Sequence, residues 1–127
     1  MNTTTRGVKV SLIFCDIDVP FEKFPGSQED ANIRQVFKIL KPKSASIRMS
    51  SGGNTHLKVV LAYPVTVLAY LQARAALGDD PQHLACDLTR MFRFGSDTAR
   101  QNLTADRKIK QGRLMEAGDW GDYFVLC

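Results

Sequence analysis

The pattern of apolar and polar residues at the start of the chain predicts a buried strand followed by a helix. Residues 8–15 (VKVSLIFC) are rich in strand-forming residues and continuously apolar in their second half, as in a central strand, and Asp16-Ile17-Asp18 ends this run. After a loop with prolines and a glycine, Ser27 can cap a helix that Pro42 closes. The apolar residues at helical spacing in this segment are Ile33, Val36, Phe37 and Leu40.

A hairpin and a second helix are predicted in the middle of the chain. Residues 44–49 and 56–62 have the composition of strands, and the polar segment 50–55, which contains two adjacent glycines, predicts a turn between them. Residues 64–77 then predict a helix, because a proline stands near its start and Gly78 is placed to end it.

The later segments predict a short helix and two further strands. Asp80-Pro81 is typical of a helix start, with the aspartate as cap and the proline in the first turn. Residues 90–94 (RMFRF) alternate basic and apolar side chains, which predicts a strand, and residues 123–126 predict another. This order of elements indicates an α+β fold of the RRM or ferredoxin-like kind, an antiparallel sheet with helices packed on one face.

Length and composition narrow the class of protein. The 127 residues indicate one domain, and 44% hydrophobic with 24% charged residues is ordinary for a globular protein. Three widely spaced cysteines without a Cys-x-x-Cys pair argue against a disulfide framework and against a zinc ribbon. Because no apolar stretch of about 18 residues occurs, we expect no membrane partner and a soluble, cytoplasmic protein.

The excess of basic residues is concentrated in the last third of the chain. The net charge is +4, and seven basic residues against two acids lie between Arg90 and Arg113. Such a local excess favours the approach of a polyanion. An ordinary solvated surface explains it equally well.

Asp16 and Asp18 are the first candidates for chemistry. Residues two apart in a strand point to the same side, so both carboxylates project from one face while Ile17 projects from the other. Two carboxylates this close repel each other. A divalent cation relieves that repulsion, and Mg²⁺ in proteins typically takes one or two carboxylates together with substrate phosphates. The alternative is a strand that ends in polar residues where it reaches solvent.

The turn before the second hairpin strand is a candidate phosphate site. Gly52 and Gly53 allow backbone N–H groups to approach an anion closely, and the Ser51 hydroxyl adds a donor. His56 opens the next strand, where its imidazole could donate to a phosphate oxygen. The alternative is a plain hairpin turn with a surface histidine.

A third group of candidates combines an acid with arginines. Arg90 and Arg93 could bind phosphates through their planar guanidinium groups. Asp87 or Asp80 could supply a third metal carboxylate, and the sequence leaves this choice open. The alternative for Asp87 is an ordinary ion pair with Arg90, one helical turn away.

These three patterns, in this order, resemble the three motifs of archaeo-eukaryotic primases, and most of all the compact primase-polymerases of archaeal plasmids and viruses. The motif-bearing core covers residues 8–96 of a single domain, 1–127, with a basic tail at 97–127. Asp16 and Asp18 match the first motif, and Ser51 and His56 match the second. Arg90, Arg93, Gly95 and Ser96 match the basic stretch that follows the third.

The resemblance implies an RRM-like nucleotidyltransferase core that uses Mg²⁺ or Mn²⁺ and nucleoside triphosphates in DNA replication. Asp16, Asp18 and either Asp87 or Asp80 would hold the metal, and Ser51 and His56 would contact nucleotide phosphates. The expected partners are single-stranded DNA or RNA as template, and a replication protein. Two other hypotheses stay open: a catalytically inactive nucleic-acid-binding replication accessory of a virus or plasmid on the same fold, and an interaction or structural protein with no nucleotide site.

Overall fold

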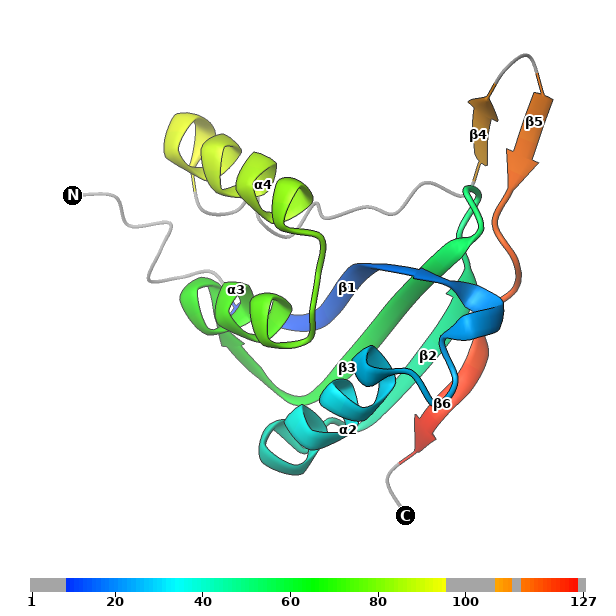
Figure 1. The fold of residues 1–127 in the computed structure, drawn as a ribbon. Helices are drawn as coiled ribbons and strands as arrows, with labels where there is room; N and C mark the ends of the chain where they lie inside the picture. Colours follow the sequence, from blue (N-terminus) through cyan, green and yellow to red (C-terminus); the bar gives the residue numbers. More distant parts are fainter. Residues whose placement is uncertain (1–8, 96–106, 111–112, 126–127) are drawn as a thin grey trace.

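The computed structural model describes residues 9–95, 107–110 and 113–125 of the chain. Helices and strands follow one another along it as shown in Figure 1. They are β1 (Lys9–Pro20), the short 3-10 helix η1 (Phe21–Lys23), α2 (Gln28–Leu40), β2 (Ser44–Met49), β3 (Asn54–Thr66), α3 (Val67–Ala76), α4 (Pro81–Phe94), β4 (Arg107–Lys110), β5 (Arg113–Glu116) and β6 (Gly121–Val125). None of the helices in these described ranges is both long and apolar enough to cross a membrane.

The centre of the molecule is a four-stranded antiparallel sheet in the order β1-β3-β2-β6. Helix α2 connects β1 to β2, and β3 fills the space between these two strands, so the first part of the chain has the ferredoxin-like arrangement. The fourth strand, β6, pairs with β2 and leaves β1 at an edge of the sheet. The α+β fold predicted from the sequence is confirmed, and β4 with β5 forms a separate hairpin.

The two faces of the sheet have opposite character because side chains alternate along each strand. Ile13, Cys15 and Ile17 of β1 point into the core together with Leu57 and Val59 of β3, and all five are fully or almost fully buried. Each fully buried aliphatic side chain contributes about 1.5–3 kcal/mol relative to exposure. Helices α2 and α3 cover this face, with Ile33, Phe37, Val67 and Leu71 in the same core.

Helix α2 begins where the sequence predicts. The Ser27 hydroxyl oxygen accepts a hydrogen bond from the Asp30 backbone N–H at 3.1 Å. The Asp30 carboxylate accepts from the Gly26 N–H at 2.9 Å and from the Tyr123 hydroxyl of β6. The same acid therefore fixes the loop that enters α2 and ties the last strand to this helix. Strand β2 has the predicted bounds, and β6 extends from Gly121 to Val125.

Helix α3 begins later than predicted, and β1 and β3 are longer. Thr66 caps α3 by accepting from the Ala69 N–H at 3.2 Å, and Pro64 belongs to β3. Pro64 lies in the irregular stretch of the β1–β3 pairing, where the absence of an N–H is tolerated. Strand β1 likewise continues past the aspartates to Pro20, so Asp16 and Asp18 lie within the strand and do not end it.

The prediction of a strand at residues 90–94 is wrong, because these residues form the end of α4. The predicted start of this helix is confirmed: Asp80 caps it by accepting from the Gln82 N–H at 3.1 Å, with Pro81 in the first position. Leu84 and Met91, seven residues apart, pack on one side against the core. This helical period over the whole segment decides the structure, whereas the five-residue alternation is too short to do so.

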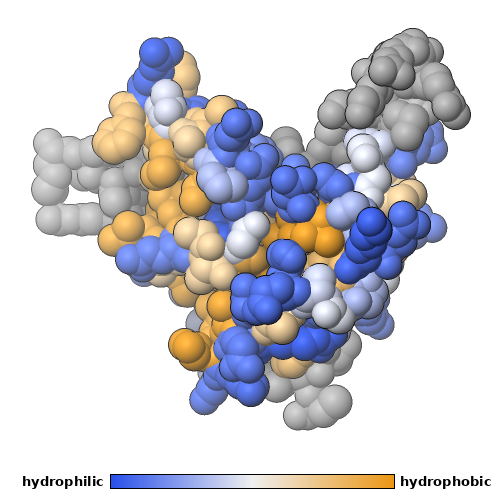
Figure 2. Space-filling model, in the orientation of Figure 1, coloured by the Kyte–Doolittle hydropathy of each residue, from blue (hydrophilic) through white to orange (hydrophobic). Residues whose placement is uncertain are grey.

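The side of the molecule that α3 and α4 form exposes large apolar side chains. Leu68 of α3 and Phe92 of α4 are both mostly exposed. Figure 2 shows hydrophobic residues gathered on this side, whereas hydrophilic residues predominate over the centre of the view. Cys86 is exposed on α4, whereas Cys15 is buried in the core.

Candidate functional site

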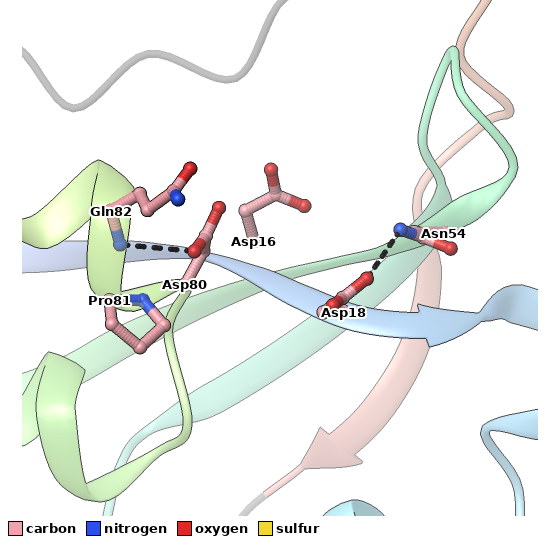
Figure 3. Close-up of a pocket in the computed structure, with 6 residues that line it drawn as sticks. All are labelled: Asp16, Asp18, Asn54, Asp80, Pro81 and Gln82. Carbon is pink, nitrogen blue, oxygen red and sulfur yellow. Dashed lines mark hydrogen bonds between the residues drawn. The ribbon is translucent and has the colours of Figure 1, made fainter.

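A cleft of about 500 Å³ lies between β1, the start of β3 and the beginning of α4 (Figure 3). Three acids line it, Asp16 and Asp18 of β1 and Asp80 at the cap of α4. Its remaining lining residues are Asn54, Pro81 and Gln82. The cleft is on the face of the sheet opposite the core.

The predicted placement of the two strand aspartates is confirmed. Ile17 is 1% exposed in the core, so Asp16 and Asp18 on either side of it project from the other face. Asp18 is turned toward Asn54, whose side-chain amide donates to it at 3.1 Å, whereas Asp16 and Asp80 extend toward the same space in Figure 3.

Of the two candidates for the third acid, Asp80 lines the cleft and Asp87 does not. Asp87 is 2% exposed, and its carboxylate lies 2.8 Å from Arg74 Nη1 and 3.5 Å from Arg90 Nη1. Two cations already neutralise this acid, and the ion pair with Arg90 at one helical turn is the alternative that the sequence left open. The structure therefore gives Asp87 a structural role.

Asp79 and Arg74, which sequence reasoning missed, hold the cleft together. One oxygen of the buried Asp79 carboxylate accepts from the backbone N–H groups of Asp16, at 2.8 Å, and of Asp80, at 3.0 Å. Its other oxygen lies 2.6 Å from Nη2 of the fully buried Arg74. The Asp80 N–H also lies 3.0 Å from the Asp16 carbonyl oxygen, so the start of α4 is fixed directly against β1.

The electrostatic environment of Asp16 disfavours its negative charge. Burial raises the pKa of the Asp16 carboxyl, nearby His83 lowers it, and the carboxylates of Asp79, Asp80 and Asp18 raise it further, with a net shift above the ordinary value of 3.8. The cleft thus concentrates negative charge that a bound cation would compensate.

His56 lies on β3, directly opposite Asp16 of β1 in the register of the two strands. Its Nε2 lies 3.9 Å from the Asp16 carboxylate, and Arg48 Nε donates a hydrogen bond to its Nδ1 at 3.0 Å. Because the Arg48 guanidinium is only a donor, Nδ1 must accept, and the proton of the imidazole is then on Nε2, toward Asp16. His56 is 5% exposed, so this orientation is enclosed by the sheet.

The glycine turn at residues 50–53 is close to the cleft but does not line it. Ser51 is buried, and the Gly53 N–H donates within the turn to the Ser50 carbonyl at 3.0 Å. The Gly53 φ of +94° is a conformation that favours glycine, which accounts for this residue without a ligand. Of the segment 50–55, only Asn54 reaches the cleft; Ser51, Gly52 and Gly53 support the turn behind it.

The structure does not bring Arg90 and Arg93 to the cleft. Both lie near the C-terminal end of α4, whereas Asp80 caps its other end. At 1.5 Å per residue, their backbones are about 15–20 Å along the helix from Asp80. Any contact of these arginines with a nucleic acid would be made beyond the carboxylate cleft.

The donors in the cleft are carboxylate oxygens, the type of ligand that Mg²⁺ takes in proteins. In the ranges that the structure describes, no group of three or more histidine, cysteine, aspartate or glutamate side chains is placed to hold a metal ion. Mg²⁺, however, commonly takes only one or two protein carboxylates and completes its shell with water and substrate phosphates. Asp16 and Asp80 supply two such oxygen ligands at one cleft.

No protein-family model matches the chain, and no curated protein or solved structure matches it either. The similarity to primases therefore stays a prediction from the motifs, and the geometry of the cleft must be tested directly.

We expect Asp16→Asn and Asp30→Asn to have opposite effects on the free energy of unfolding as the pH rises, each compared with the wild type. Because the pKa of Asp16 is raised above 3.8 in the folded chain, the contribution of Asp16 to the stability of the wild type falls as the pH rises from 3.8 through the raised pKa. Asp16→Asn should then gain in free energy of unfolding over the wild type as the pH rises, and show no such gain below 3.8.

Asp30 provides the matched control. Burial raises the pKa of Asp30, but the hydrogen bonds from Tyr123 and the Gly26 N–H and the charge of Arg34 outweigh it, so the pKa is lowered from 3.8. The stabilisation by Asp30 is present above pH 3.8 and is lost as the pH falls. Asp30→Asn should therefore lower the free energy of unfolding most at neutral pH. Urea unfolding from about pH 2.5 to about pH 7 measures both. The same sign for both variants would contradict this account of the cleft.

Proposed function

We propose that the chain is a metal-dependent nucleotidyltransferase of the primase-polymerase type that acts in DNA replication inside the cell. The observation that supports this most is that Asp16, Asp18 and Asp80 line one cleft on the open face of the sheet, with His56 beside Asp16. The carboxylates come from two separate motifs, and Asp79 fixes both backbones together.

Asp16 and Asp80 are the residues that would hold Mg²⁺ or Mn²⁺, and Asp18 with Asn54 closes the other end of the cleft. A metal in this position supplies charge compensation for a triphosphate and orientation of the attacking 3′-hydroxyl. Phosphoryl transfer depends mainly on such positioning and electrostatic stabilisation.

His56 would act as a donor to phosphate beside the metal carboxylates. Arg48 holds the imidazole so that Nε2–H points toward the Asp16 side of the strand pair. A phosphate oxygen that enters next to Asp16 would meet this N–H and the positive charge of Arg48 behind it. Both side chains are buried and neither lines the cleft, so the imidazole would have to become more accessible for this contact.

Metal and nucleotide should stabilise the folded chain together. With Mn²⁺ and a nucleoside triphosphate about a hundredfold above their dissociation constant, the Tm should rise by about 10 °C, because only the folded state binds them. The double variant Asp16→Asn, Asp18→Asn should fold and lose this rise. Differential scanning fluorimetry with and without EDTA measures both.

The matched control is Asp119→Asn, an exposed carboxylate outside the cleft, which should keep the full shift. A wild-type protein whose Tm does not respond to metal and nucleotide would overturn the proposal. Metal-dependent extension of a primed single-stranded template by the wild type, lost in the Asp16→Asn variant, would distinguish turnover from binding.

A nucleic-acid-binding accessory without catalysis is the second candidate, and Trp120 favours it. Trp120 lies over the open face of the sheet, where its ring is 6.1 Å from the Phe14 ring. The Arg48 guanidinium lies 4.5 Å, and the Lys58 ammonium 4.7 Å, from its centroid. Aromatic rings combined with cations are the usual surface for single-stranded nucleic acid, because bases stack on the ring and phosphates meet the cations.

Trp120→Ala should weaken binding of single-stranded DNA about tenfold, since the loss of one stacked base costs about 1–3 kcal/mol. Fluorescence anisotropy with a labelled oligonucleotide at fixed salt measures this. Phe92→Ala, which removes a highly exposed ring on α4, is the control and should bind as the wild type does. Equal losses in the two variants would exclude the sheet face as the binding surface.

A further inference from the structure

A second groove lies on the helix-covered side of the sheet, away from the carboxylate cleft. It has a volume of about 410 Å³ and lies between the second half of α2 and strand β6. Phe37 and Phe124, whose rings pack edge to face with centroids 5.3 Å apart, form its apolar floor. The remaining lining residues are Arg34, Lys38 and Lys41, all of them basic.

Every charged residue that lines the groove is basic. Arg34 is held in place by the Asp30 carboxylate at 3.0 Å and by the ring of Tyr123, 4.4 Å from its guanidinium carbon. Lys38 and Lys41 are exposed at the C-terminal end of α2. No carboxylate is among the residues that the structure places along this groove. An apolar floor with a basic rim is complementary to an apolar side chain flanked by acids.

The backbone at Lys41 gives an independent reason to connect this rim with function. Lys41 has φ 51° and ψ 58°, and it is the one non-glycine residue with positive φ in the described part of the chain. This left-handed conformation costs a residue with a side chain about 1–2 kcal/mol, and glycine is the usual residue at such helix ends. The helix dipole favours a cation near this end, but Lys38 already supplies one without strain.

We propose that this groove binds an acidic peptide segment of a partner protein, with an apolar side chain seated on Phe37 and Phe124 and carboxylates against Lys38 and Lys41. The face on which the groove lies argues against a template strand as its occupant, because Asp16 and Asp80 are on the other side of the sheet. The carbon-lined floor also lacks the polar groups that would read a base edge. The inference does not depend on the proposed catalytic function.

The test is an NMR titration of the ¹⁵N-labelled full chain, which detects weak binding. The probe is a synthetic peptide of about ten residues, in which one phenylalanine and one leucine are flanked by aspartates. Two control peptides replace either the apolar residues by serine or the aspartates by asparagine. The acidic apolar peptide should shift the amide resonances of Lys38, Lys41 and Phe124, leave those of Asp16 and Asp18 unchanged, and bind at least about tenfold more tightly than either control.

Variants of Lys41 show whether this residue contributes to peptide affinity rather than to the stability of the fold. Lys41→Gly should raise the Tm by a few degrees, because glycine relieves the left-handed strain, and should weaken peptide binding about threefold or more. Lys38→Glu with Lys41→Gly should weaken it about tenfold or more. Lys43→Gln, which changes an exposed lysine just outside the groove, should leave both quantities unchanged.

Three outcomes would overturn this inference. The first is no shift of the groove resonances by the acidic apolar peptide. The second is equal binding of the serine control, which would mean that only charge is recognised. The third is a single-stranded oligonucleotide that shifts the same resonances more strongly, which would make the groove a nucleic-acid surface.

Discussion

The buried pair of Arg74 and Asp79 is the interaction on which the candidate site depends. Arg74 is fully buried and is neutralised by Asp79 and Asp87, which lie on either side of the cap of α4. Removal of one partner from such a pair costs about 3–5 kcal/mol, because a charge is left buried and unpaired. Asp79 also accepts the backbone N–H groups of Asp16 and Asp80, so the interaction that neutralises the arginine fixes the spacing of the cleft.

One face of the sheet carries the side chains of the core, and the other carries the side chains of the candidate site. From Ile13 to Ile17 in β1 and from Leu57 to Leu61 in β3 every second residue enters the core, and the residues between them include the acid, Asp16, and the cation, Lys58, of the open face. The register places Asp16 opposite His56, and His56 opposite Arg48, so one row across three strands combines a carboxylate, a histidine and an arginine. Such a row needs no loop to hold it, and its geometry is set by the backbone hydrogen bonds of the sheet.

Local patterns predicted much of this from the sequence. The Ser27 cap, strand β2, the Asp80-Pro81 helix start and the shared face of Asp16 and Asp18 depend on neighbouring residues, and all are confirmed. The strand at residues 90–94 failed because a short alternation competed with a longer helical period. Arg74 and Asp79 could not be found, since their pairing joins α3, the following loop and β1, and the choice of Asp80 over Asp87 depends on that same contact.

Paramagnetic NMR tests most directly whether strand β1 and the cap of α4, which Asp79 holds together, form a site for a divalent cation. Mn²⁺ added in small amounts to the ¹⁵N-labelled chain with a nucleoside triphosphate broadens amide resonances near the ion. We expect the resonances of Asp16, Asp80 and Gln82 to broaden first, while those of Lys41 and Arg93 stay sharp. Broadening that begins elsewhere, or no selective broadening, would contradict this expectation.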